Sequence, residues 1–239
     1  MKGLLIAVQF LTRLPTPRVT ATDADFAASI RWFPAVGLIV GAIVAGGAWA
    51  GAWLDPWMGA LAALVLWVRV TGALHLDGIG DVADAAGAAH QDRARLLAVL
   101  ADPHVGSFAV VTIVLQLAAK LVLLHLLASA GQILPIVLIP FAARIGPLAW
   151  ARWLPSLHEG LGARFRGTVR PVDITLWCVA LLAASWFVPA LLAAFVLIPL
   201  WAWRLHRTLG GVSGDGHGAG IELIESGLLL AALVLERLL

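Results

Sequence analysis

The sequence is poor in charge and in cysteine. Only 13% of its 239 residues are charged and 61% are apolar, whereas a soluble domain has about 25% charged and about 45–50% apolar residues. Such a chain has too little polar surface to cover itself in water, which excludes a lone soluble globule. The single cysteine, Cys178, excludes a disulfide framework and a zinc site built from cysteines. We therefore expect an all-α, polytopic membrane protein that forms one domain over residues 1–239.

The sequence contains several long apolar runs. A membrane-spanning helix needs about 20 mostly apolar residues, and the runs of this kind predict about seven crossings, with six as the alternative. The stretch 172–209 is too long for one crossing, and Pro189 divides it into a short and a longer helix. The expected spans are Val36–Leu54, Trp57–Leu76, Ser107–Leu127, Ile133–Ala151, Val172–Phe187, Ala190–Leu209 and Leu223–Leu239.

Basic residues fall on one side of the seven-span model. The loops at residues 55–56, 128–132 and 188–189 contain no Lys or Arg, and the loops on the other side hold most of the basic residues. By the positive-inside rule that side is cytoplasmic, so the N-terminus lies inside and the C-terminus outside. We expect residues 1–35 to form an amphipathic segment at the cytoplasmic surface of the cell (inner) membrane. The basic residues lack interleaved aromatic side chains, so no nucleic-acid partner is expected.

Three aspartates form the first candidate site. Asp77, Asp81 and Asp84 lie in HLDGIGDVADA, just beyond the second expected span, and on a helix their spacing places them on one face. Close carboxylates repel each other, and Mg²⁺ binds carboxylate oxygens together with substrate phosphates. We predict all three as Mg²⁺ ligands, with Asp81, Asp84 or His75 as catalytic groups. The alternatives are an acidic helix start and a structural hydrogen bond at His75.

A short segment before the third span supplies two more candidates. Asp102 and His104 lie in ADPHVGS, after a predicted amphipathic helix at about 91–101. Asp102 is a candidate catalytic carboxylate, and His104 is a candidate contact for a substrate phosphate. Asp-Pro also initiates turns, which explains Asp102 without catalysis.

A glycine-rich segment before the last span is the second candidate site. GGVSGDGHGAGIELIES covers residues 210–226. Glycines let backbone N–H groups approach an anion closely, and a helix start adds partial positive charge. We predict Asp215 as catalytic, Glu222 as a metal ligand, and Gly214 and Glu225 as substrate contacts. The alternative is a flexible loop followed by helix-start carboxylates.

Basic residues on the same side complete the predicted site. Arg144, in the cytoplasmic half of the fourth span, needs a partner such as an aspartate of the first cluster or a substrate phosphate. Arg164 and Arg166 lie in the loop 152–171, which is either a surface for an anionic ligand or ordinary positive-inside topology. Lys120 lies in mid-span and is costly there unless it is paired or lines a cavity. The sequence names no partner for it.

These features favour one reaction class. Clustered carboxylates and arginines suit Mg²⁺-assisted displacement at a phosphate, in which an alcohol is the nucleophile. The loops expected to carry the site are 77–106, 152–171 and 210–221. From the residues alone, a membrane phosphotransferase that acts on an alcohol is the extent of the prediction.

Four segments resemble the signature blocks of a known family. HLDGIGDVADA, ADPHVGSF, HEGLGARF and GGVSGDGHGAGIEL are similar, in this order, to blocks of the cobalamin synthase family, the adenosylcobinamide-GDP ribazoletransferases. FLTRLPTP and RWFPAVGLIVG also fit, so the resemblance runs from about Phe10 to Leu230. It implies a membrane enzyme that needs Mg²⁺ and joins adenosylcobinamide-GDP to α-ribazole, or to α-ribazole 5′-phosphate, with release of GMP. The resemblance points to Asp77, Asp81 and Asp84 as metal-binding candidates. Asp215 and Glu222 belong to the late block, and Asp102 and Arg144 fall in further matching segments.

The sequence departs from the family's usual pattern at five positions. The family usually has a basic residue at Ala101 and at His104, glycine at Ala85 and Ala109, and an aliphatic residue at His217. Two cationic positions beside Asp102 are therefore replaced here. Arginines of the 152–170 loop are the candidates to compensate for them.

Three other functions use the same residues. A CDP-alcohol phosphotransferase usually has its aspartates and an arginine in one longer segment, which the first cluster here lacks. A divalent-cation or substrate transporter would use Asp77, Asp81 and Glu222 as a pathway, although transporters place carboxylates near the midplane. A scaffold for other corrinoid-assembly enzymes would need no catalytic carboxylate. The resemblance is compatible with association with such enzymes and with a homo-oligomer.

Overall fold

The structure is a computed structural model that describes residues 2–88, 93–100, 102, 104–157, 160 and 162–238. Within these residues it is helical apart from turns and one isolated bridge between Ser156 and Val212, which confirms the all-α expectation. Ala101 and residues 91–92 of the expected amphipathic helix lie outside the described residues, as do His158 and Glu159. The helices are α1 (Lys2–Leu11), α2 (Asp23–Ala28), η1 (Ser29–Trp32), α3 (Phe33–Ala52), α4 (Pro56–Thr71), α5 (Leu74–Ala88), α6 (Arg93–Leu100), α7 (Ser107–Ser129), α8 (Ile133–Ala143), α9 (Gly146–Trp153), η2 (Gly162–Phe165), α10 (Pro171–Ser185), η3 (Pro189–Ala193), α11 (Ala194–Thr208) and α12 (Gly214–Leu238).

The helix lengths confirm a polytopic bundle and give five or six candidate crossings by length and composition. Among the described residues, five apolar helical segments are long enough to span a membrane, and the bent pair of α4 and α5 adds a sixth candidate. The expected span Val172–Phe187 corresponds to α10, which has 15 residues. At 1.5 Å per residue it extends about 22 Å, less than the about 30 Å of a hydrocarbon core. The five segments are Asp23–Ala52, Ser107–Ser129, Ile133–Trp153, Pro189–Thr208 and Gly214–Leu238.

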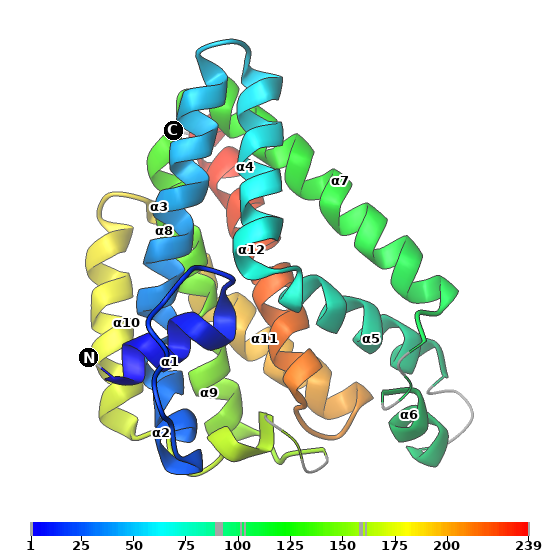
Figure 1. Cartoon of the computed structure of the whole chain (residues 1–239). Coiled ribbons are helices and arrows are strands. Elements are labelled where there is room, and N and C mark those ends of the chain that lie inside the picture. The colour runs from blue at the N-terminus through cyan, green and yellow to red at the C-terminus, as the bar shows by residue number, and fades with distance from the viewer. Residues whose placement is uncertain are drawn as a thin grey trace.

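Small residues allow the central helices to pack closely. In Figure 1, α3, α4, α8 and α12 run side by side, while α7 diverges from them toward α5 and α6. The spacing of Gly37 and Gly41 on α3 is the small-xxx-small pattern of membrane helix pairs. A Cβ at either glycine would clash with the backbone of α8, at Pro140 and Val137 respectively. The two helices can therefore approach only because these positions lack a side chain.

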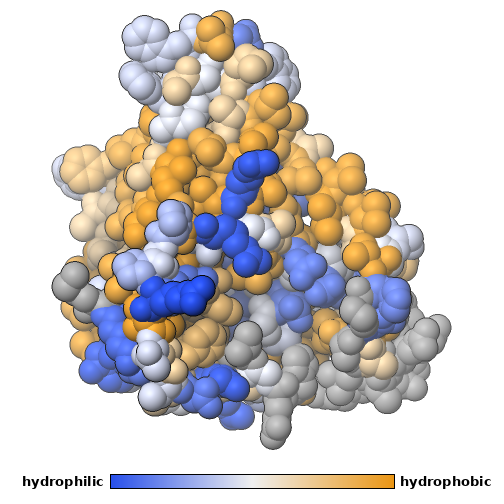
Figure 2. All heavy atoms as spheres, in the orientation of Figure 1, coloured by the Kyte–Doolittle hydropathy of each residue, from blue (hydrophilic) through white to orange (hydrophobic). Residues whose placement is uncertain are grey.

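The surface has the polarity expected of a protein in lipid. On the face drawn in Figure 2, hydrophobic atoms cover α3, α4 and α7, and hydrophilic atoms gather around α1, α2 and α5. On α7, Val110, Val111, Val114 and Leu115 are all exposed, which is typical of a lipid-facing helix and costly in water. Residues 131–132 and 188–189, from two of the loops without Lys or Arg, lie together with Glu236 of α12 around one cavity.

A sharp bend separates the first acidic motif from the second span. The expected span Trp57–Leu76 ends early, because Gly72 (φ 62°) and Ala73 (φ 59°) both adopt left-handed backbone conformations after Thr71. That conformation costs a non-glycine residue about 1–2 kcal/mol. α5 then runs at 84° to α4 (Figure 1). We take α4 as the crossing and α5 as a helix outside it.

The glycine-rich segment is a helix and not a loop from Gly214 onward. α12 begins at Gly214, well before the expected Leu223, and the Ser213 hydroxyl accepts the N–H of Gly216 at 3.0 Å as a cap. A Cβ at Gly220 would clash with the side chains of Trp150 and Trp201. The predicted loop at 210–221 is therefore corrected. Its glycines make room for neighbouring helices.

Candidate active site

The two acidic motifs lie against each other. α5 and α12 form one of the most extensive helix contacts in the bundle. A Cβ at Gly78 would lie 2.7 Å from the carbonyl oxygen of Asp215, and a Cβ at Gly218 would lie 3.3 Å from the Cα of His75. The first of these distances is too short for any side chain. Glycine at position 78 therefore allows the backbones of the two motifs to touch.

The loop after α9 joins the same place. The N–H of Val212 donates to the Pro155 carbonyl at 2.9 Å, and the N–H of Leu157 donates to the Val212 carbonyl at 3.1 Å. Further along, a Cβ at Gly162 would lie 2.7 Å from the nitrogen of Gly214. Three of the motif segments, separated by long stretches of sequence, thus meet around the start of α12.

A cavity of about 270 Å³ lies between these segments. Gly214 lines it and is exposed, and its predicted contact with a substrate stays a prediction. A concave site with an apolar wall and a few convergent polar groups is typical of ligand binding. The polar groups are His75, Asp77, Asp215 and His217. The apolar wall includes Phe10, Phe33 and Phe165, whose ring centroids lie 5.4–6.0 Å apart.

Sequence reasoning missed this aromatic wall and the place of His217 in the cavity. A signal was present, because the three phenylalanines belong to three segments singled out for their resemblance: FLTRLPTP, RWFPAVGLIVG and HEGLGARF. Each segment contributes one ring to the same cavity. The charges and glycines of these segments do not indicate that their phenylalanines come together.

Asp81 lies in a field of negative charge. Its pKa is raised to about 6, because partial burial and the carboxylates of Asp215, Asp77 and Asp84 disfavour its charged form. A divalent cation would relieve this repulsion, so the donor set fits Mg²⁺. Among the described residues, no three His, Cys, Asp or Glu side chains converge closely enough to hold one ion together. Mg²⁺ needs only one or two carboxylates, since it retains waters and binds substrate phosphates.

Asp84 has a structural partner. Its Oδ2 accepts the N–H of Gly106 at 2.7 Å, and its Oδ1 accepts the N–H of Ala109 at 3.0 Å. Gly106 is the N-cap residue of α7, so Asp84 caps that helix from a different element and places a negative charge at its positive end. This contact fixes α7 to α5. The predicted catalytic and metal-binding roles of Asp84 stay predictions.

Asp102 and His104 contact each other. Asp102 Oδ1 lies 2.6 Å from His104 Nδ1 and accepts the His104 N–H at 2.9 Å, which is the turn that Asp-Pro sequences favour. Both side chains are largely exposed, and neither is among the described residues that line the cavity. Their predicted roles stay predictions.

The arginines of the 152–171 loop lie outside the cavity lining. Arg164 pairs with Asp23 of α2, so its guanidinium has a protein partner, and its contact with an anionic ligand stays a prediction. Arg166 is exposed. Neither is among the described residues that line the cavity.

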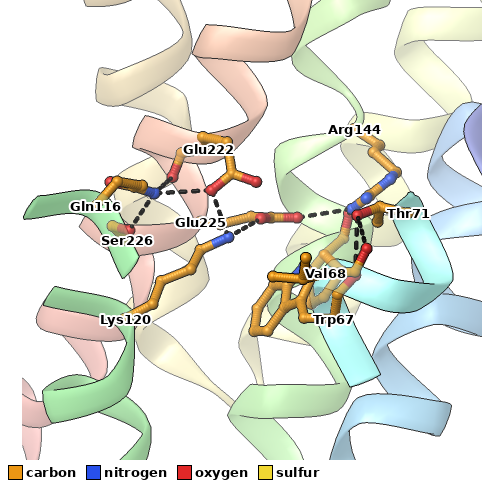
Figure 3. Close-up of polar contacts among 10 residues, drawn as sticks. Trp67, Val68, Thr71, Gln116, Lys120, Arg144, Glu222, Glu225 and Ser226 are labelled. Carbon is orange, nitrogen blue, oxygen red and sulfur yellow. Dashed lines mark hydrogen bonds and ion pairs between the residues drawn. The ribbon is translucent and has the colours of Figure 1, made fainter. Parts of the chain in front are cut away.

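Glu222 and Glu225 lie in a buried ion network within α12. Lys120 Nζ is 2.7 Å from Glu222 and 2.6 Å from Glu225, and Arg144 is 2.8 Å from the other oxygen of Glu225. Figure 3 shows Glu225 lying between the two cations, which come from α7 and from the break between α8 and α9. All four side chains are almost completely buried. Two positive and two negative charges thus compensate each other inside the bundle.

The structure gives these residues partners other than the predicted ones. Arg144 contacts Glu225 and the Pro140 carbonyl, where we predicted an aspartate of the first cluster or a substrate phosphate. Glu222 binds Lys120 and accepts a hydrogen bond from Gln116 at 2.8 Å, where we predicted Mg²⁺. Helix α12 starts earlier than expected, so both glutamates lie inside it and not at its first turn. Buried charges without partners are strongly destabilising, so we assign this network to the stability of the bundle.

Comparisons with known proteins identify the family. The family model described as cobalamin-5-phosphate synthase matches residues 3–233. The chain is 63% identical to an adenosylcobinamide-GDP ribazoletransferase of Novosphingobium aromaticivorans, over 98% of this chain and 97% of the relative. It is 54% identical to one of Laribacter hongkongensis over 100% and 99%, and 36% identical to one of Pseudomonas aeruginosa over 97% of each. No solved structure matches the chain. The protein belongs to the cobalamin-5-phosphate synthase family.

Proposed function

We propose that this protein joins adenosylcobinamide-GDP to α-ribazole, or to α-ribazole 5′-phosphate, and releases GMP in the assembly of the cobalamin nucleotide loop. A ribazole hydroxyl attacks the phosphate on the cobinamide side. The new O–P bond forms, the anhydride bond to GMP breaks, and the hydroxyl proton passes to a base. The observation that carries the proposal is the meeting of both acidic motifs at one cavity, in a chain that matches its relatives over almost its full length.

The carboxylates of the two motifs are the residues that would hold Mg²⁺. Asp77 and Asp215 line the cavity, and Asp81 lies within their field. When bound, Mg²⁺ supplies positive charge that stabilises the phosphate oxygens as the anhydride bond breaks. Asp77 or Asp215 accepts the proton from the attacking hydroxyl. Asp84 acts as a positioning residue, because it holds the start of α7 against α5.

The site belongs on the cytoplasmic side of the cell membrane. Asp55 and its loop lie at one end of α3 and α4, and Lys2, Arg13 and the arginines of the 152–170 loop lie in segments on the other side of the crossings. The positive-inside rule assigns the basic side to the cytoplasm. The water-soluble product GMP would leave on that side.

The test uses membranes that contain the protein, with adenosylcobinamide-GDP, α-ribazole and Mg²⁺, and follows GMP and the cobalamin product by mass spectrometry. Both products should appear together, and EDTA or Asp81→Asn should abolish them. Asp55→Asn is the matched control, since Asp55 caps α4 at the other end of the bundle and asparagine caps equally well. It should retain full activity. Intact substrates with well-inserted wild-type protein would contradict the proposal and favour a transporter or a scaffold.

A further inference from the structure

Two histidines, His75 and His217, are buried in the lining of the cavity. His75 is 2% exposed and His217 is 6% exposed. Neither ring nitrogen of either residue has a hydrogen-bond partner within the described ranges. Buried polar groups in proteins are almost always hydrogen-bonded, and both imidazoles line the same cavity of about 270 Å³. A molecule in this cavity would therefore supply the missing partners.

The walls around His217 suit a flat aromatic ring. The His217 ring lies 5.9 Å from that of Trp150 at an interplanar angle of 27°, and 6.4 Å from that of Phe165 at 75°. Phe10 and Phe33 extend the aromatic surface. Aromatic rings prefer such offset and edge-to-face neighbours. A neutral imidazole also presents one N–H donor and one acceptor nitrogen, so a heterocycle with an unsubstituted ring nitrogen has a donor available there.

The other wall of the cavity is polar. Asp77 and Asp215 line it together with His75, and sugar hydroxyls can donate to carboxylates and to an imidazole nitrogen. The volume of about 270 Å³ lies just below the range of about 300–1,000 Å³ for drug-sized ligands. The cavity therefore accommodates a base and its sugar and excludes a corrinoid ring system.

We propose that this cavity binds the nucleoside acceptor, with its base against the aromatic wall and its sugar toward Asp77 and Asp215. The His217 N–H donates to the unsubstituted ring nitrogen of the base, and His75 hydrogen-bonds to the sugar hydroxyls. Adenosylcobinamide-GDP stays outside and presents its phosphate at the mouth. This inference rests on the proposed function, because it takes α-ribazole as the acceptor.

The test measures coupling between His217 and the base. The ligands are α-ribazole and an analogue in which a carbon replaces the unsubstituted ring nitrogen, and their Kd values are measured by calorimetry on the full-length protein in nanodiscs. The wild type should bind the analogue about tenfold more weakly, because one hydrogen bond is lost. His217→Leu should bind both ligands with the same Kd. Equal discrimination by the wild type and His217→Leu would overturn the inference.

Two variants keep this result interpretable. His217→Gln, which retains an N–H donor, should recover part of the discrimination. His125→Leu is the matched control, because His125 is stacked on Trp57 at 3.7 Å near the other end of α7 and also has a buried unpartnered ring nitrogen among the described residues. It should discriminate tenfold, as the wild type does; loss of discrimination in His125→Leu would contradict a specific contact at His217.

Failure of the inference can be separated from failure of the proposed function. If the wild type releases GMP and forms cobalamin but His217→Leu still discriminates between the two ligands, the base binds elsewhere and the reaction stands. If the wild type binds α-ribazole with the expected coupling but releases no GMP, the cavity assignment stands and the proposed reaction fails.

Discussion

Gly78 of α5 lies against the backbone of Asp215 at the start of α12, where an added Cβ would be 2.7 Å from the Asp215 carbonyl oxygen. The contact joins two motifs that are far apart in the sequence. It sets the distance between Asp77 and Asp81 on one helix and Asp215 on the other. A glycine that carries no chemistry thus determines where the carboxylates lie.

Gly78→Ala should therefore inactivate the enzyme while the bundle stays inserted. The added methyl forces α5 and α12 apart, and a displacement of about 1 Å at a reacting centre can cost about 100-fold in rate. We expect GMP release to fall by about that factor. Gly46→Ala is the control, because a Cβ at that helical glycine meets nothing within 4 Å among the described residues. Equal activity of the two variants would show that the contact at position 78 does not position the site.

The acidic motifs and their helix could be predicted from the sequence, but the role of their glycines could not. Glycine lowers helix propensity by about 1 kcal/mol, so the glycine-rich segment at 210–221 favoured a loop. The structure forms a helix from Gly214, because Gly218 and Gly220 make room for His75 and for two tryptophans. Tertiary packing here outweighs the low helix propensity of glycine, and such packing cannot be read from a single sequence.

The buried network illustrates the same limit. The mid-span position of Lys120 indicates that a partner must exist. That partner lies on α12, more than a hundred positions away in the chain, and no local spacing rule connects them. By contrast, the end of α4 could be predicted from the sequence. Glycine at a helix end commonly adopts the left-handed conformation, and Gly72 does so here.

Mg²⁺ should stabilise the protein more strongly at neutral than at acidic pH. The pKa of Asp81 is raised to about 6 by burial and by neighbouring carboxylates. Without metal, the charged form is disfavoured in the folded state, so this group lowers stability as the pH rises through 6. Mg²⁺ binds the ionised form and reverses that loss. At pH 5 only about one tenth of the Asp81 carboxyl is ionised, and the affinity for Mg²⁺ should fall about tenfold.

Thermal unfolding in detergent, with and without Mg²⁺, measures this effect at pH 7.5 and pH 5. The wild type should show the larger increase in Tm at pH 7.5. Asp81→Asn should show a small increase that changes little between the two pH values. A metal effect with the same pH dependence in both proteins would remove Asp81 from the metal site.

Substitutions at Asp84 should act mainly on stability. Asp84→Ala leaves the N–H groups of Gly106 and Ala109 without their acceptor, and loss of a helix cap costs about 0.5–2 kcal/mol. Asp84→Asn keeps an acceptor oxygen, so its Tm should stay closer to that of the wild type. Both Tm values and the Mg²⁺ dependence of GMP release are measured. If Asp84→Asn weakens Mg²⁺ binding as strongly as Asp81→Asn does, Asp84 is a metal ligand as well as a helix cap.

The stability of variants in the ion network should depend on the balance of buried charges and not on the number of contacts that remain. Glu222→Gln removes one of two buried carboxylates and leaves an excess positive charge, for which breaking a buried pair costs about 3–5 kcal/mol. Adding Lys120→Met removes that excess and keeps the neutral pair of Arg144 and Glu225. The double variant should therefore have a higher Tm than Glu222→Gln alone, which a double-mutant cycle quantifies. It should also retain the Mg²⁺ dependence of GMP release, because the structure places Glu222 on Lys120. Additive losses of Tm would show that the two residues do not compensate each other. Loss of the Mg²⁺ dependence of GMP release would indicate that Glu222 is a metal ligand.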